Sequence, residues 1–151
     1  MEIQDSTKPK KVGKVITVQQ AIEKADTKTF VAHPIAPLQL TSKIFDLLQQ
    51  CLTTKQVRKG INETLKLINK ENVELVILAA NANPLELLAS LPLICEEKSI
   101  PYCFVPEAAG LGRACGIKRP IICCAVLKGS SSNINSQIDL LKDKIELLMY
   151  S

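Results

Sequence analysis

A basic segment with a single acid carries groups suited to binding an anion. In KQVRKGINETLK (55–66), basic side chains surround the expected start of a helix, and Glu63 is the only acid. These basic residues are Lys55, Arg58, Lys59 and Lys66. The first amides of a helix have no partner within the helix, and with the helix dipole they suit a phosphate. Gly60 would also permit close approach of a nucleic-acid backbone.

The same helix end carries groups that read base edges. Asn62 and Glu63 precede Lys66 by about one turn, so an amide, a carboxylate and an ammonium share this end. Amide and carboxylate side chains hydrogen-bond to bases, while lysines hold the backbone. A single acid in a basic cluster favours base recognition over plain charge attraction. The alternative is a solvated helix start with Glu63 near the positive end of the dipole.

A second basic group follows a short predicted helix. Arg113, Lys118 and Arg119 stand in a glycine-rich stretch that leads into an apolar run. Loops at one end of an α/β sheet commonly form its binding site. If the segment NANP (81–84) reaches the same end, three segments converge there. The alternative is an ordinary Gly-Pro connection with solvated arginines.

Catalytic and metal-binding patterns are poorly supported. The sequence contains no Gly-x-Ser-x-Gly, His-Glu-x-x-His or Walker motif, and His33 is its only histidine. GLGRAC (110–115) departs from the dinucleotide fingerprint, because Cys115 replaces the third glycine and no acid follows at the expected distance. The six cysteines form no Cys-x-x-Cys pair, and we expect buried, reduced thiols. We therefore predict no enzyme, cofactor or metal.

Composition predicts one aliphatic domain that remains inside the cell. The chain has 151 residues, of which 46% are hydrophobic and 3% aromatic. Its net charge of +4 permits an anionic partner. No apolar run approaches the roughly 20 residues that span a bilayer. The N-terminus lacks the apolar part of a signal peptide, which favours the cytosol or nucleus.

Helical and strand patterns alternate along the chain. We expect residues 1–30 to form a basic, flexible arm and residues 31–151 to fold. Apolar runs predict strands within 73–80, 100–106 and 120–127. Helices are predicted after an N-cap at Thr41, over 60–70, from Pro84 with a kink at Pro92, over 108–115, and along an apolar stripe near the C-terminus. That stripe contains Ile134, Ile138, Leu141, Ile145 and Leu148. This order predicts a single-domain, three-layer α/β/α sandwich with a central mixed sheet.

Three stretches carry a resemblance to a known family. KGINETLK, LAANANPLELLASLPLICEEKSIPYCFV and LGRACGIKRP resemble the small kink-turn RNA-binding proteins of the L-seven-Ae class. Within that class the chain is most similar to the Snu-thirteen type, which the U4/U6.U5 tri-snRNP and box C/D snoRNPs share. The resemblance runs from about Pro34 to the C-terminal helix and implies the same α/β/α sandwich.

The resemblance also implies which residues meet RNA. The residues that would contact the tandem sheared G·A pairs of a kink-turn are Gly60, Asn62, Glu63 and Lys66. Arg58 and Lys59 would hold flanking phosphates. The loop with Ile117 and Arg119 would close over the bulge. A pocket including Asn83 and Leu87 would receive the extruded nucleotide, and splayed-out bases are common targets in RNA recognition.

Two departures from the family pattern concern that pocket. The family usually has an acid where this chain has Asn83, and often a basic residue near Glu107 or Ala108. The pocket is therefore less charged here, although an amide still offers a donor and an acceptor. The loop GIKRP also resembles that of the H/ACA-type paralogue, whereas LGRACG and the Asn-Glu pair favour the Snu-thirteen type.

By resemblance, the chain would be a non-catalytic RNA-binding scaffold of the nucleus and nucleolus. It would bind kink-turns in U4 snRNA and box C/D snoRNAs, and serve mRNA splicing, rRNA processing and ribosome biogenesis. Implied protein partners are the Prp-thirty-one splicing factor and the Nop-fifty-six and Nop-fifty-eight proteins, with a monomer outside the particle. Alternatives are an H/ACA-type or ribosomal paralogue, a protein adaptor with weakened RNA binding, and a thiol enzyme using Cys103 or Cys115.

Overall fold

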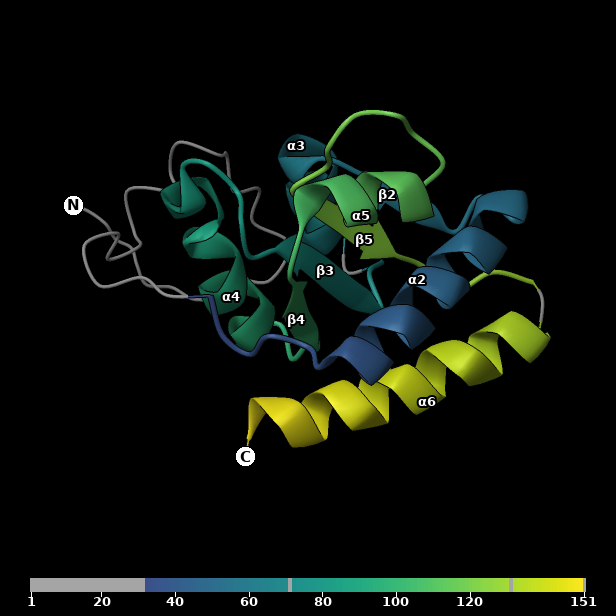
Figure 1. Cartoon of the computed structure of the whole chain (residues 1–151). Helices are drawn as coiled ribbons and strands as arrows, with labels where there is room; N and C mark the ends of the chain where they lie inside the picture. The colour runs from purple at the N-terminus through teal and green to yellow at the C-terminus, as the bar shows by residue number, and fades with distance from the viewer. Residues whose placement is uncertain (1–31, 71, 131, 151) are drawn as a thin grey trace.

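A four-stranded mixed sheet lies between two layers of helices in the computed structural model, which describes residues 32–70, 72–130 and 132–150 (Figure 1). The strands are β2 (Val57–Lys59), β3 (Leu75–Ala79), β4 (Tyr102–Val105) and β5 (Cys123–Val126). The helices are α2 (Leu38–Thr53), α3 (Ile61–Asn69), the 3₁₀ helix η1 (Leu85–Leu88), α4 (Ser90–Glu97), α5 (Ala108–Ala114) and α6 (Ser132–Met149). The predicted α/β/α sandwich is confirmed, whereas the predicted arm lies outside the described residues.

The strand order gives the sheet two functionally different edges. The order is β2-β5-β3-β4, with β5 antiparallel to both neighbours and β3 parallel to β4. The edge where β2, β3 and β4 end and β5 begins, at Lys59, Ala79, Val105 and Cys123, is called the carboxyl edge below. The opposite edge, where β3 and β4 begin, is called the amino edge.

Alternate strand residues pack into two separate cores. Leu75, Ile77 and Val105 face the layer of α2, α5 and α6. Val76 and Phe104 face the layer of α3 and α4. All five residues of β3 are buried, which explains its continuous apolar sequence. All six cysteines are buried as free thiols, as predicted for small hydrophobic residues.

Three local predictions were wrong. The helix predicted from a cap at Thr41 begins at Leu38, and Thr41 is buried inside it, where its Oγ1 donates to the carbonyl oxygen of Ala36 at 3.2 Å. The predicted kink at Pro92 is instead a break at Ala89, between η1 and α4. Pro92 lies in the first turn of α4, where a missing N–H leaves no hydrogen bond broken. The sequence reading also missed β2.

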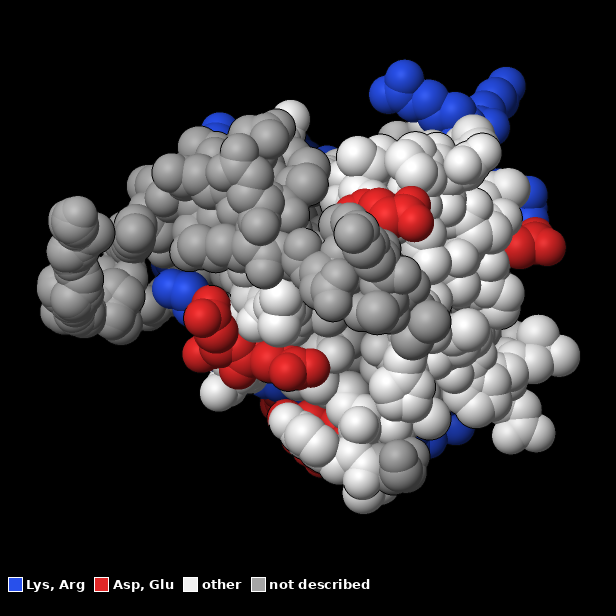
Figure 2. Space-filling model, turned by 90° about the vertical axis from the view of Figure 1, so that its left-hand side faces the viewer, with Lys and Arg blue, Asp and Glu red and all other residues white. Residues whose placement is uncertain are grey.

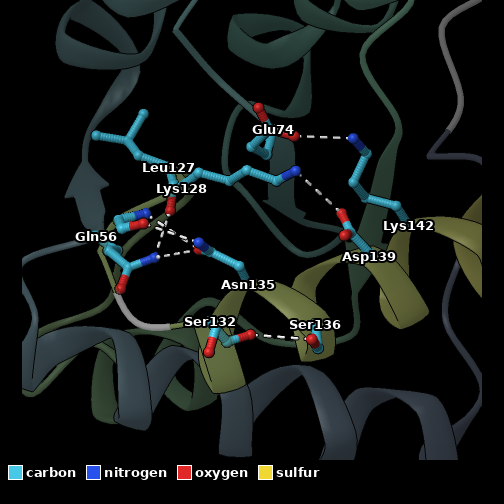
Figure 3. A network of polar contacts seen from close by, with 10 residues as sticks. Gln56, Glu74, Leu127, Lys128, Ser132, Asn135, Ser136, Asp139 and Lys142 are labelled. Atoms are coloured by element: carbon cyan, nitrogen blue, oxygen red, sulfur yellow. Dashed lines mark hydrogen bonds and ion pairs between the residues drawn. The ribbon is translucent and has the colours of Figure 1, made fainter.

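A polar network that is buried at Gln56 and partly exposed at Asn135 joins the start of β2 to the start of α6 (Figure 3). The side chain of Gln56, 2% exposed, donates from Nε2 to the carbonyl oxygen of Leu127 at 2.8 Å and accepts from Thr54 Oγ1. Asn135 holds the backbone of Gly129 through both its amide oxygen and its amide nitrogen. These bonds position β2 against the C-terminal helix.

None of the helices in the described residues is long and apolar enough to cross a bilayer.

Candidate nucleic-acid interface

The carboxyl edge brings the predicted site segments together through backbone hydrogen bonds. The amide of Gly60, at the junction of β2 and α3, donates to the carbonyl oxygen of Cys123 at 2.8 Å. The amide of Ala79, at the end of β3, donates to the carbonyl oxygen of Ile122 at 2.9 Å. The loop that enters β5 therefore lies between the start of α3 and the loop that follows β3.

The side chain of Asn81, for which the sequence predicted no role of its own, holds the β3–η1 loop in place. Asn81 Oδ1 accepts from the backbone amide of Ala108 at 2.7 Å, and this ties the β3–η1 loop to the start of α5. The carbonyl oxygen of Ala108 accepts from the amide of Ile121 at 3.1 Å. Only the preference of Asn for accepting hydrogen bonds from backbone amides in loops and caps could have indicated this role.

The start of α3 presents the predicted base-reading residues to solvent. Gly60 precedes the helix at φ 99° and ψ 156°, a conformation that is essentially limited to glycine. Within the described chain, no side chain caps the first turn of α3, so its amides face outward. Asn62 and Lys66 are exposed and Glu63 is half-buried. Asn62 and Glu63 therefore lie in the first turn of α3, whereas Lys66, predicted to share that end, lies in the last turn of this nine-residue helix.

The predicted phosphate-binding residues lie on β2, not on the helix. Val57 is buried, whereas Arg58 and Lys59 are exposed because β2 lies at the margin of the sheet. Arg58 Nη1 donates to the carbonyl oxygen of Lys55 at 3.2 Å.

The charge of Lys59 also affects a thiol. A hydrogen bond from Cys124 and the charge of Lys59 both lower the pKa of Cys115.

The loop between α5 and β5 carries Lys118 and Arg119 of the second basic group and is tightly packed at its base, whereas Arg113 lies in the last turn of α5. Ile117 is half-buried and donates its amide to the carbonyl oxygen of Gly112 at 2.9 Å. Gly116 has a positive φ of 76°, which reverses the chain after α5. Arg119 is exposed farther along the loop. The structure therefore places Ile117 at the base of this loop and Arg119 in solvent.

Asn83 and Leu87 follow β3, so the residues predicted to receive an extruded nucleotide stand apart from α3. Asn83 is exposed, and Leu87 on η1 is 38% exposed. Leu88 beside it is fully buried and anchors η1 to the core. β3 lies two strands from β2 in the sheet, a separation of about 10 Å at the usual spacing. The loop that enters β5 lies between the two groups.

Exposed positive charge predominates at this edge. Its basic residues are Arg58, Lys59, Lys66, Arg113, Lys118 and Arg119, all exposed. The acids on the same segments are Glu63, Glu86 and Glu107. Figure 2 shows Lys and Arg side chains at the top of the molecule, at the height where Figure 1 shows the α5–β5 loop. The surface is therefore suited to a polyanion.

The titratable groups show no arrangement typical of a metal site. Across residues 32–70, 72–130 and 132–150, no three His, Cys, Asp or Glu side chains are grouped as ligands. Burial raises the pKa of the Cys103 thiol to about 12, which keeps it protonated near neutral pH. Cys103 lies in the core near the start of β4, away from the carboxyl edge.

Comparison with known proteins identifies the family. Residues 42–136 match the Ribosomal protein L7Ae/L30e/S12e/Gadd45 family, and the chain belongs to it. NHP2-like protein 1 homolog of Drosophila melanogaster is 48% identical over 118 residues, covering 78% of this chain and 93% of that protein. The 13 kDa ribonucleoprotein-associated protein of Saccharomyces cerevisiae is 45% identical over 118 residues, covering 78% and 94%.

A solved structure shares the fold. The 15.5kD RNA binding protein of Giardia lamblia superposes with a TM-score of 0.74 at 34% identity. The superposition covers 78% of this chain and 96% of that protein. In each of these comparisons nearly all of the relative is matched, while about a fifth of this chain has no counterpart.

Proposed function

We propose that this chain is a non-catalytic RNA-binding protein that recognises kink-turns, with sheared G·A pairs and an extruded base, in U4 snRNA and box C/D snoRNAs. The observation that carries the proposal is the convergence of three segments on the carboxyl edge: the start of α3, the β3–η1 connection and the α5–β5 loop. Two of its relatives are named as a ribonucleoprotein-associated protein and an RNA binding protein, which supports RNA as the ligand.

Each segment supplies a different kind of contact in this proposal. Asn62 and Glu63 hydrogen-bond to the sheared pairs, because an amide can donate to and accept from an adenine edge and a carboxylate can accept from guanine imino and amino groups. Gly60 lets the RNA backbone approach, and Lys66 pairs with a phosphate. Binding energy from these contacts stabilises a sharply bent RNA, and no bond is made or broken.

The remaining residues complete the site. Arg58 and Lys59 on β2 hold flanking phosphates. The loop with Ile117 and Arg119 closes over the bulge, and a pocket including Asn83 and Leu87 receives the extruded nucleotide. The family's usual acid is replaced by Asn83, whose amide offers both a donor and an acceptor to the extruded base.

The proposed setting is the nucleus and nucleolus, where the protein nucleates tri-snRNP and box C/D snoRNP assembly. A bent RNA and the protein surface beside it would form a joint platform for Prp-thirty-one, Nop-fifty-six and Nop-fifty-eight type proteins. The chain would be a monomer before it enters such a particle.

A gel-shift titration tests the proposal directly. One RNA carries a box C/D kink-turn, and its twin has Watson–Crick pairs in place of the sheared G·A pairs. At one fixed salt concentration, we expect tight binding to the first and weak binding to the second, because phosphate contacts alone do not distinguish them. Equal binding would reduce the site to a nonspecific basic surface. Binding to neither would favour a protein adaptor.

A second candidate is an H/ACA-type or ribosomal paralogue. Lys118 and Arg119, followed by Pro120, favour it because the H/ACA-type loop has a similar Lys-Arg-Pro. The two candidates differ in their RNA and not in the chemistry of the site. Competition among C/D, H/ACA and ribosomal kink-turns for the same protein distinguishes them.

A further inference from the structure

A ring of three hydrogen bonds holds the start of α3 against β5. The amide of Gly60 donates to the carbonyl oxygen of Cys123 at 2.8 Å, and the amide of Thr64 donates to the carbonyl oxygen of Gly60 at 3.0 Å. The ring closes inside the core, where Cys123 Sγ donates to Thr64 Oγ1 at 3.4 Å. Residue 123 therefore holds the first turn of α3 at two points, once through its backbone and once through its side chain.

The side-chain contact of this ring is shielded from water. Thr64 and Cys123 are both 0% exposed, and Thr64 belongs to the small group of polar side chains that are buried in the described chain. Burying a hydroxyl is costly unless it has a hydrogen-bond partner. Valine has almost the same shape as threonine and needs no partner, so packing alone does not explain the hydroxyl at this position.

The hydroxyl gives α3 a directional contact that its apolar residues do not supply. Leu65 and Ile68 anchor the helix in the core, but hydrophobic contacts fix no particular angle. A hydrogen bond weakens steeply when its distance or angle changes. Thr64 is also β-branched, so its χ1 is restricted and its hydroxyl follows the orientation of the helix backbone. The bond from Cys123 therefore fixes the rotation of α3 about its own axis.

The rotation of α3 decides where its base-reading groups point. Asn62 and Glu63 immediately precede Thr64, and the first of them is exposed and the second half-buried. A rotation of about 15° moves a side-chain tip by about 1.5 Å, because the tips lie about 5–6 Å from the helix axis. Binding groups have to be held within about 0.5 Å of their productive positions. A small rotation of α3 would therefore disturb hydrogen bonds to a base.

We propose that Thr64 and Cys123 are positioning residues, which set the orientation in which Asn62 and Glu63 meet a base pair. This inference rests on the proposed RNA recognition, and neither positioning residue touches the RNA. The phosphate contacts proposed for β2 do not depend on the rotation of α3. Thr64 and Cys123 therefore determine selectivity for sheared G·A pairs more than affinity for RNA in general.

The variant T64V tests the proposal, because it removes the hydroxyl and retains the branched shape. Dissociation constants are measured for the box C/D kink-turn and for its twin with Watson–Crick pairs, at one salt concentration. We expect T64V to weaken binding to the kink-turn about tenfold, in the range of one lost base contact, and binding to the twin less than about twofold. The conservative variant T64S retains the hydroxyl and should restore the selectivity of the parent chain.

Thr41 offers a matched control within the same chain. It is likewise buried in a helix, and its Oγ1 donates to the carbonyl oxygen of Ala36 at 3.2 Å. It lies in α2, however, on the opposite face of the sheet from α3. The variant T41V should therefore lose stability and keep its selectivity. Equal losses of selectivity in T41V and T64V would reduce the effect to general destabilisation and overturn the proposal.

Hydrogen exchange gives a readout that needs no RNA. The Gly60 amide belongs to the ring, so local opening should make it exchange about tenfold faster in T64V and in C123A than in the parent chain. T41V should leave this amide unchanged. C123A removes only the thiol, and it tests the same contact if T64V does not fold. An unchanged Gly60 amide in these variants would overturn the positioning role.

The outcomes separate this inference from the proposed function. A parent chain that distinguishes the two RNAs, together with a T64V variant that distinguishes them equally well, would leave the proposed function standing and remove the positioning role. Equal binding of both RNAs by the parent chain would instead remove the proposed function, and the inference with it.

Discussion

The backbone of Arg119 lies directly against Gly112. A methyl group on Gly112 would overlap the carbonyl oxygen of Arg119, and it would also lie 3.4 Å from the amide nitrogen of Ile121. Gly112 is fully packed within α5 and has no positive φ, so only the lack of a side chain explains its identity. The α5–β5 loop therefore keeps its path because residue 112 is glycine.

Replacing Gly112 with alanine should move this loop. The rigid backbone of Arg119 has to shift, and overpacking of this kind costs about 1–3 kcal/mol. We expect a melting temperature lower by several degrees, and weaker RNA binding because Ile117 and Arg119 are displaced. The matched control is G110A on the same helix, where the new methyl meets the Phe45 ring at 3.2 Å. Since that half-buried ring can turn, G110A should cost less. Equal losses in calorimetry would contradict this account.

Replacing Glu63 with alanine should weaken RNA binding and leave the fold intact. Glu63 is half-buried in the first turn of α3. The loss of one good base contact costs about 1–3 kcal/mol, or roughly five- to 150-fold in affinity. Isothermal titration with a kink-turn RNA measures the loss. The control D143A, on the exposed face of α6, should bind as the parent does. Unchanged affinity of E63A would remove Glu63 from base recognition.

Replacing Gln56 with leucine should destabilise the domain although the new side chain is similar in size. The carbonyl oxygen of Leu127 would lose its donor, and a buried unsatisfied group costs about 1–3 kcal/mol. Denaturant unfolding should show a lower midpoint with an unchanged slope. The variant T54V removes a single hydrogen bond to the Gln56 side chain, so it should lower the free energy of unfolding by less than Q56L does. A stabilised Q56L protein would show that the network is not needed.

Stability should fall at alkaline pH because the thiols are buried. Burial raises the pKa of Cys51 to about 11 and that of Cys103 to about 12. A thiol in the unfolded chain titrates near pH 8.5, so above that pH the unfolded state releases protons first. Stability is therefore complete below about pH 8.5 and declines toward pH 11–12, by up to about 1.4 kcal/mol per pH unit and thiol. Thermal melts from pH 7 to 11, in reductant, measure this decline. The variant C51V/C103V should make the decline less steep without abolishing it, because the pKa values of the buried Cys95, Cys123 and Cys124 are raised as well.

Long apolar patterns could be interpreted from sequence because packing determines them. The buried run of β3 and the stripe along α6 both occur where predicted, since each must cover a continuous core. The Gly-Ile-Asn-Glu segment (60–63) was likewise predicted at a helix start. There, the conformation of Gly60 and the helical spacing of Asn62 to Lys66 are both local properties of the chain.

Short or tertiary features could not be predicted in the same way. β2 has three residues, of which only Val57 is buried, so no periodicity reveals it, and its pairing depends on β5 more than 60 positions later. The break at Ala89 depends on how η1 packs in the folded chain. Pro92, in the first turn of α4, led instead to the incorrect prediction of a kink at that residue. The capping of α5 by Asn81 joins residues 27 positions apart. Such contacts arise only in the folded chain.

The central place of β5 in the sheet has a consequence for synthesis. β5 lies between β2 and β3, yet it is the last strand to leave the ribosome. Until it pairs, β2 has no neighbour, and the amide of Gly60 has no acceptor at Cys123. Because β2 and β5 are far apart in the sequence, their pairing forms late in folding. A nascent chain thus carries Lys66 of α3 well before the segments of the carboxyl edge are joined, and their convergence arrives with the final strand.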